Sequence, residues 1–305
     1  MKFTRIVITV AALLAILVCG PRSMATAASH SPRVIALAER DHLDTLAPTL
    51  RRLANRTPGV VAISVVDLTD GFSIAINGDK NLPAASTIKV PVMVEVMRQV
   101  SLGKFSLRRA VSLQDRDRDC GYGSLCDAGW GKQYTVWALL QRMITVSDNT
   151  ATNMLIRLVG RQNVNQTMLS LGFTQTWLGD SIRSDGDVRE LRTSANDMMH
   201  LLGMIAERRL INPSASDIML DILAGQRHNR LIPAWLPKGL TIAHKTGTLH
   251  DTLNDVGIVE LDGAPYVICI LTTHWQDLDV GEHFIRQASL LTFRAFRQKS
   301  AVNAN

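Results

Sequence analysis

The stretch "AASTIKVPVM" (84–93) marks the point at which the chain changes from one type of secondary structure to the other. Before it, "VVAISVVDL" (60–68) and "FSIAIN" (72–77) are rich in β-branched residues, and the Asp-Gly pair between them is typical of a hairpin turn. After it, apolar residues recur at spacings of three and four, as in "TVWALLQRMI" (135–144). Residues 84–93 are therefore predicted to form a strand-to-helix junction.

Strand character returns near the end of the chain, in apolar runs at 240–249, 255–262 and 265–273. Amphipathic stretches at 39–56 and 281–297 are predicted to be helices. Two early strands, a helical insertion and three late strands form one sheet only if the two ends of the chain meet. We therefore predict an α/β fold of the α+β type: a five-stranded antiparallel sheet flanked by N- and C-terminal helices, with an inserted all-α lobe.

This organisation divides the chain into four parts. We predict a signal peptide at 1–27, a discontinuous sheet lobe at 28–83 and 225–298, an all-α lobe at 84–224, and a tail at 299–305. The junction between the two lobes is a natural place for a cleft.

The first residues are typical of a secretory leader. A short basic head is followed by an apolar run at 6–18, and small residues then precede a cleavage point after Ala27. The apolar run is too short for a comfortable membrane span, so we expect a secreted or periplasmic protein without a membrane anchor after cleavage. Lipidation of Cys19 is the alternative, but the bulky Val18 before it disfavours a lipoprotein.

The charge and composition exclude some kinds of partner. The chain is 46% hydrophobic and 20% charged, which is ordinary for a globular protein. Its net charge of +6 falls to +3 once the leader's three cationic residues are removed, too mild a charge to indicate nucleic-acid binding. We expect a monomer that needs no cofactor or metal.

The cysteines allow one small disulfide. Cys120 and Cys126 flank "GYGSL", close enough to close a loop in an oxidising compartment, although spacing alone leaves the pairing open. Cys269 lies in an apolar run and is interpreted as a core residue.

Ser86 and Lys89 are three positions apart at the start of the predicted helix. A hydroxyl becomes a good nucleophile when a base lies within hydrogen-bond reach, and a buried, partly neutral lysine amine can serve as that base. The structural alternative is a helix start with Ser86 or Thr87 as cap and Lys89 extended outward.

The run "VSDN" (146–149) joins two helical segments. Its short polar side chains suit a cap or turn. In the functional interpretation, the Ser147 hydroxyl relays a proton to a leaving amine and Asn149 donates to a substrate amide.

The apolar segment "LTIAHKTGTL" contains Lys245, which is costly to bury without a purpose. Lys245 can supply positive charge to the serine relay and to a substrate carboxylate, with Thr246 as a hydroxyl partner. Gly247 lets a substrate backbone approach closely. The backbone amides of Ser86 and Thr248 are candidates for an oxyanion hole.

The three motifs S-x-x-K, S-D-N and K-T-G, in this order, resemble those of class A β-lactamases and penicillin-binding proteins. The resemblance covers roughly residues 35–298 and includes the order of the interrupted sheet. It implies acyl transfer: Ser86 attacks the carbonyl of a β-lactam or an acyl-D-alanyl peptide, and water or an amine resolves the acyl-enzyme.

The segment 173–196 departs from the class A pattern. Class A enzymes carry E-x-x-L-N here, and its glutamate holds the water for deacylation. Glu190 is the only glutamate of this segment and lacks the following asparagine, so it resembles a later acidic residue that braces the loop. Asp180, Asp185 and Asp187 are candidate substitutes, and each also suits a turn.

A second departure follows the K-T-G motif. Leu253 stands where many relatives have an arginine for the substrate carboxylate. Arg230, or else Arg227, is our candidate for that role.

Three functions fit these observations. The first is a secreted serine β-lactamase, possibly slow in deacylation. The second is a penicillin-binding D,D-peptidase-like or esterase-like hydrolase, and the third is a module that binds β-lactams without hydrolysing them. The chain has no spare length for the extra domains of many wall peptidases, which favours the first.

Overall fold

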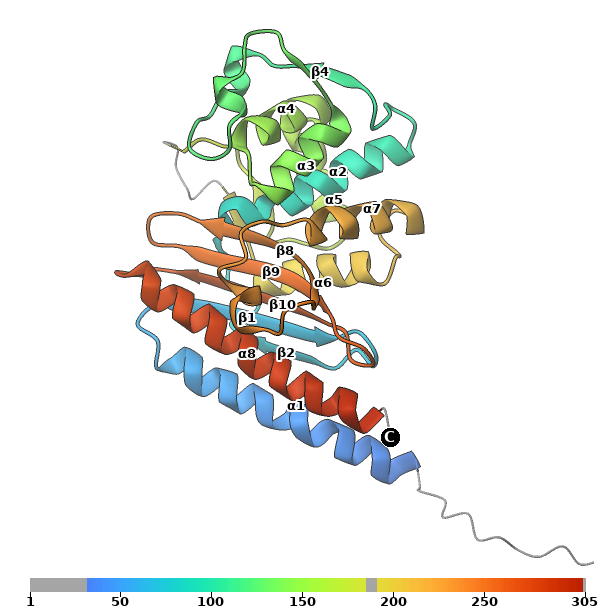
Figure 1. The fold of residues 1–305 in the computed structure, drawn as a ribbon, viewed down its shortest axis with the longest axis vertical. Coiled ribbons are helices and arrows are strands. Elements are labelled where there is room, and N and C mark those ends of the chain that lie inside the picture. The colour runs from blue at the N-terminus through green and yellow to red at the C-terminus, as the bar shows by residue number, and fades with distance from the viewer. Residues whose placement is uncertain (1–31, 185–190, 304–305) are drawn as a thin grey trace, which may run out of the picture.

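The two early and three late strands form one antiparallel sheet, as predicted, each within two residues of its predicted limits. The fold is described from a computed structural model for residues 32–184 and 191–303. The sheet has the order β2-β1-β10-β9-β8, so the first strand of the chain pairs with the last (Figure 1). The strands are β1 (Val60–Asp67), β2 (Ser73–Ile76), β8 (Thr241–Thr248), β9 (Leu253–Glu260) and β10 (Tyr266–Thr273).

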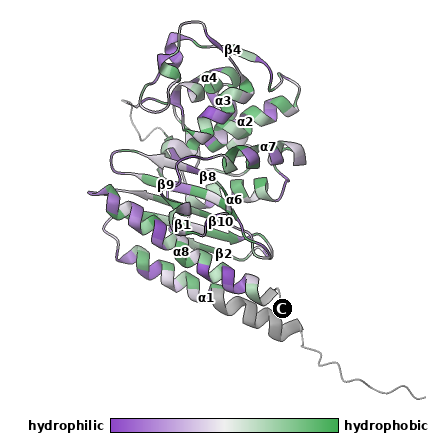
Figure 2. Cartoon of the chain, viewed as in Figure 1, coloured by the Kyte–Doolittle hydropathy of each residue, from purple (hydrophilic) through white to green (hydrophobic). Residues whose placement is uncertain are grey.

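Two long helices, α1 (Pro32–Asn55) and α8 (Leu278–Asn303), lie side by side on one face of the sheet (Figure 1). Alternate residues of β1, namely Val61, Ile63 and Val65, pack into the apolar layer beneath them. Figure 2 shows hydrophobic and hydrophilic stretches alternating along α8, as expected for a helix with one buried face.

The opposite face of the sheet is covered by α6 (Ala195–Ala206), which joins it to the inserted helical lobe (Figure 1). At the centre of this lobe is α2 (Lys89–Ser101), whose residues from Lys89 to Met97 are all buried. Around it pack α3 (Val136–Thr145), α4 (Asn149–Val159), α5 (Arg161–Ser170) and α7 (Pro213–Ala224).

Two small sheets and several short 3₁₀ helices were not predicted, because elements of two to four residues leave no periodic pattern. One sheet has the order β3-β7-β6 and joins residues before the Ser86 junction to the segment after α5. The other pairs two strands of the helical lobe. The strands are β3 (Leu82–Pro83), β6 (Trp177–Leu178) and β7 (Leu191–Thr193), and β4 (Ala110–Ser112) with β5 (Gln133–Thr135).

The C-terminal helix is longer than the predicted one. It continues to Asn303, through residues that we expected to form a tail. Lys299 is 3% exposed and pairs with Asp67 and Asp70 of the β1–β2 turn, so this part of the chain belongs to the fold. The predicted signal peptide lies outside the described residues, and none of the described helices combines the length and apolar character needed to span a bilayer.

Candidate active site

Ser86 lies in a 3₁₀ turn, η1 (Ala85–Ile88), directly before α2. The preceding Ala85 has a φ of 47°, a left-handed conformation that is uncommon for a residue with a side chain and often found at functional sites. Ser86 is half-buried and lines a cavity of about 470 Å³ between the two lobes. The junction therefore presents the serine at the surface and the next helical turn to the interior.

Lys89 is fully buried, so the alternative of a lysine extended into solvent is wrong. Its Nζ donates to the Ser147 carbonyl (2.6 Å), the Ser147 Oγ (3.0 Å) and the Asn149 Oδ1 (2.7 Å). Burial, followed by the nearby charge of Lys245, lowers the pKa of Lys89 well below its ordinary value. The amine therefore loses its proton more readily than an exposed lysine does.

Lys245 reaches the same serine from the sheet side. It is fully buried on β8, and its Nζ donates to the Ser147 Oγ (3.1 Å) and to the Thr246 carbonyl (2.7 Å). Burial lowers the pKa of Lys245 to about 7, although the charge of Asp255 opposes the shift. The Ser147 hydroxyl thus lies between two lysine amines, one from each lobe.

The turn that carries Ser147 is held by the residue after it. Ser147 has a φ of 60°, and Asp148 caps α4 by accepting from the Ala151 amide (2.8 Å). The other carboxylate oxygen of Asp148 accepts from the backbone N–H groups of Ser124 (2.9 Å) and Leu125 (3.0 Å). The cap interpretation therefore holds for Asp148, while Ser147 and Asn149 point their side chains at Lys89.

The outer edge of β8 faces Ser86. Leu249 N–H donates to Thr252 across the β8–β9 turn, so the neighbouring N–H of Thr248 points to the opposite, unpaired edge. A Cβ at Gly247 would lie 3.1 Å from the Ser86 nitrogen, which explains the need for glycine there. Ser86 and Thr248 both line the cavity, so their amides can face one oxyanion.

The rest of the cavity wall comes from two loops and the strand edge. Asp180 is the single carboxylate among the described lining residues; it is exposed and accepts from the Ser181 amide. Glu190, Asp185 and Asp187 lie outside the described residues. Besides Ser86 and Thr248, the lining includes Tyr122, Asn149, Asp180, Ile182, Arg183, Leu191, Leu249 and His250.

The structure does not bring Arg230 to this cavity. Its guanidinium is 77% exposed and pairs with Glu282 on α8, and the side chain of Arg227 is also exposed away from the described lining. The cation on the described wall is Arg183, which precedes the 185–190 segment. Sequence reasoning missed it because nothing distinguishes it from other loop arginines.

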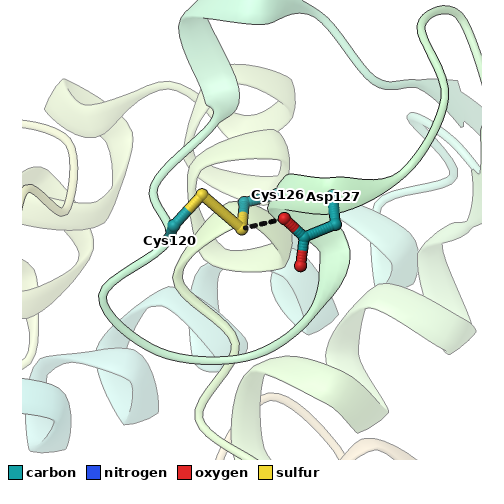
Figure 3. A group of neighbouring side chains, drawn as sticks. All are labelled: Cys120, Cys126 and Asp127. Atoms are coloured by element: carbon teal, nitrogen blue, oxygen red, sulfur yellow. Dashed lines mark hydrogen bonds between the residues drawn. A yellow bond between two sulfur atoms is a disulfide. The ribbon is translucent and has the colours of Figure 1, made fainter.

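Cys120 and Cys126 form a disulfide, the pairing that spacing alone left open. Figure 3 shows it with Asp127 beside it, 3.5 Å from the Cys126 sulfur. Because the two sulfurs are bonded to each other, they are not free thiolates that could ligate a metal. The closed loop carries Tyr122 into the cavity wall, a role that the cysteine spacing did not reveal.

Comparisons with known proteins agree with this geometry. The model of the beta-lactamase enzyme family matches residues 45–296. The structure of PBP-A is 31% identical, with a TM-score of 0.79, over 84% of this chain and 97% of that chain. A beta-lactamase from Sphaerobacter thermophilus is 30% identical (TM-score 0.78), over the same shares of 84% and 97%. An ancestral class A beta-lactamase is 28% identical (TM-score 0.74), over 82% of this chain and 99% of that chain.

The family match spans most of the described fold, including all three motifs and both lobes that hold them. The neighbours share the interrupted sheet and inserted helical lobe over nearly their whole length. The chain therefore belongs to the beta-lactamase enzyme family and is a serine hydrolase of the class A-like type.

Proposed function

We propose that the protein is a secreted, monomeric serine β-lactamase that opens the β-lactam amide through an acyl-enzyme on Ser86. The observation that carries this proposal is the position of the Ser147 hydroxyl, within hydrogen-bond distance of both Lys89 (3.0 Å) and Lys245 (3.1 Å). Lys89 in its neutral form can take the proton of the nucleophile, and the Ser147 hydroxyl can pass a proton on from Lys89 to the leaving nitrogen. The charged Lys245 on the other side of this hydroxyl favours transfer in that direction.

Acylation follows from the roles of these groups. Lys89 in its neutral form takes the Ser86 proton as the oxygen attacks the lactam carbonyl, and Ser147 delivers a proton to the departing nitrogen. The amides of Ser86 and Thr248 stabilise the developing oxyanion. Charged Lys245 attracts the substrate carboxylate, the role that we expected of it, whereas Arg230, the second cation expected there, pairs with Glu282.

Substrate binding involves three further groups. One N–H of the Asn149 amide remains for the substrate's amide carbonyl, since the other is bonded within the protein. Thr246 can bind the carboxylate beside Lys245, and Gly247 leaves room for the substrate along the strand edge.

Deacylation is the slow step of this proposal. Water must be activated on the open face of the ester, and the E-x-x-L-N pattern that supplies the base in class A enzymes is missing from 173–196. Asp180 is on the wall but exposed, where water competes for its hydrogen bonds. We expect a burst of acylation followed by low turnover, measurable by pre-steady-state kinetics.

The second candidate is a penicillin-binding, D,D-peptidase-like or esterase-like hydrolase. The missing E-x-x-L-N pattern favours it, as does the likeness to PBP-A, a variant of which is known as an acyl-enzyme complex with penicillin G. The third candidate, a module that stays acylated, has the same first step and differs only in never releasing the product.

Mass spectrometry after addition of a penicillin distinguishes the three candidates. A transient adduct with accumulating penicilloate supports the β-lactamase, and turnover of an acyl-D-alanyl peptide supports the second candidate. A permanent adduct supports the third. Ser86→Ala should form no adduct at an unchanged melting temperature; an adduct on that folded variant would remove Ser86 from the role of nucleophile.

Export is proposed from the leader alone. Expression of the full chain in a Gram-negative host should give a periplasmic product whose N-terminus is Ala28. An uncleaved cytoplasmic product would contradict export, and a diacylglycerol-modified Cys19 would identify a lipoprotein.

A further inference from the structure

Asp119 lies behind the cavity wall, outside the three motifs, and is 8% exposed. Its carboxylate accepts four hydrogen bonds from three different segments. Asn149 Nδ2 (2.7 Å) and the Gly121 amide (3.0 Å) donate to one oxygen, and the Ser184 amide (2.7 Å) and hydroxyl (3.0 Å) donate to the other. All three segments contribute residues to the cavity lining.

The carboxylate determines which way the Asn149 amide faces. An ionised carboxylate can only accept, so the NH₂ end of Asn149 must point to Asp119 and the carbonyl end to Lys89 Nζ, 2.7 Å away. With the amide reversed, its oxygen would lie against the carboxylate and its NH₂ against the lysine amine. The first contact would be repulsive in a buried site, and the second would be repulsive whenever Lys89 is protonated.

We propose that Asp119 is a positioning residue for acylation: it orients the Asn149 amide, and through that amide it holds the Lys89 amine in place beside Ser147. The inference deepens the proposed function, because it rests on Lys89 as the base. The chain of hydrogen bonds runs from Asp119 through Asn149 and Lys89 to Ser147.

The charges around Lys89 support this role and predict the direction in which the Lys89 pKa changes when Asp119 is replaced. Lys245 lowers the pKa of Lys89, whereas Asp148 and Asp119 raise it. Burial opposes ionisation of Asp119, but its hydrogen bonds from Asn149, Ser184 and Gly121 lower its pKa, so it is charged at neutral pH. Removing that charge should lower the pKa of Lys89. The acidic limb of the pH profile of the acylation rate should then move to lower pH.

The test compares Asp119→Asn with a matched control, Asp117→Asn. Asp117 is in the same loop and is also buried, but its carboxylate pairs with Arg157 (2.8 Å). Two quantities are measured on each folded protein: the titration of the Lys89 amine by NMR with ¹³C-labelled lysine, assigned with Lys89→Met, and the rate of acylation by a penicillin.

Asp119→Asn should lower the Lys89 pKa and slow acylation at neutral pH by about 10-fold or more, since a small displacement of a reacting group is costly. The control should lose stability while leaving the Lys89 titration unchanged. If Asp119→Asn does not fold, Asp119→Ser keeps an acceptor for the Gly121 amide and should shift the titration in the same direction.

An unchanged Lys89 titration in the folded Asp119 variants would overturn the inference, as would an equal shift in Asp117→Asn. The proposed function fails separately. If the wild-type protein forms no adduct with any penicillin, acyl transfer is contradicted, yet the NMR titration still decides whether Asp119 controls the Lys89 amine.

Discussion

At the scale of residues, the site depends on two lysines with opposite requirements. Lys89 acts without its proton, and Lys245 acts with it. The charge of Lys245 lowers the pKa of Lys89, and two amines that share one hydroxyl lose their protons in two macroscopic steps. Lys89 is the one expected to lose its proton first, because Lys245 lowers its pKa in addition to the effect of burial.

This arrangement predicts a bell-shaped pH dependence of the acylation rate. The rate should rise with pH as Lys89 loses its proton, and fall as the pH passes the Lys245 pKa of about 7. Lys245→Arg should extend activity to higher pH, because arginine stays charged. The exposed Lys238→Arg is the control and should leave the profile unchanged. A wild-type rate that is flat from pH 6 to 9 would contradict these roles.

The sequence predicted the motif residues better than the residues around them. Ser86, Lys89, Ser147 and Lys245 are recognisable because they stand in three motifs whose order resembles that of the class A family, whereas the spacing of Ser86 and Lys89 alone fits a helix start equally well. Asp119 and Tyr122 lie in an irregular loop, whose contacts depend on how distant segments meet rather than on any local period. Arg230 was predicted to bind the substrate carboxylate because it lies shortly before the K-T-G strand in the sequence. Its side chain instead pairs with Glu282 on the C-terminal helix.

At the scale of elements, the approach of β8 to the serine turn leaves no room for a side chain at Gly247. A Cβ there would lie 3.0 Å from both the Ala84 carbonyl and the Ala85 Cβ. Gly247→Ala should push the strand edge away from Ser86 and slow acylation by about 10²-fold, since oxyanion geometry would be lost. Gly129→Ala, where a Cβ meets nothing within 4 Å, should acylate normally. Equal rates for both variants would show that the edge is not part of the site.

The disulfide closes a loop with a sequence separation of only 6, so its effect on the unfolded chain is small. Replacing Cys120 and Cys126 together by serine should lower the free energy of unfolding by about 2 kcal/mol. It should also raise KM, because Tyr122 lies on the cavity wall and contacts His228 edge-on, at 5.7 Å between ring centroids. Urea unfolding and steady-state kinetics measure the two effects. Dithiothreitol should reproduce both in the wild-type protein but change nothing in the double variant.

At the scale of the whole molecule, a buried ion pair ties the end of the chain to its beginning. Lys299 Nζ donates to Asp67 (2.6 Å), Thr69 (2.9 Å) and Asp70 (2.8 Å). Burial opposes its charge, but the hydrogen bonds that it donates to these aspartates raise the pKa of Lys299. Its contribution to stability is therefore fully present below the ordinary lysine pKa and is lost as the pH rises through the raised value.

Lys299→Met should lower the free energy of unfolding by about 3 kcal/mol, because it leaves the Asp67 carboxylate buried without its cation. The deficit relative to the wild type should shrink above the ordinary lysine pKa, where the wild-type pair itself weakens. Chemical denaturation at several pH values measures this, and the exposed Lys238→Met should fall within about 0.5 kcal/mol of the wild type. If Lys299→Met had the same free energy of unfolding as the wild type at neutral pH, the ion pair would not contribute to stability.

The pairing of β1 with β10 also sets the order in which a growing chain can assemble. Val60 pairs with Thr273, so the sheet cannot close until nearly the whole polypeptide has been made. The inserted helices carry local contacts and can form earlier, with Ser86, Lys89 and Ser147 already among them. Strand β8, whose unpaired edge faces Ser86, is synthesised only with the last quarter of the chain. Nascent or truncated polypeptides that end before β8 should therefore carry the nucleophile and its base but lack the Lys245 charge and the Thr248 amide, so they should not be acylated by a penicillin.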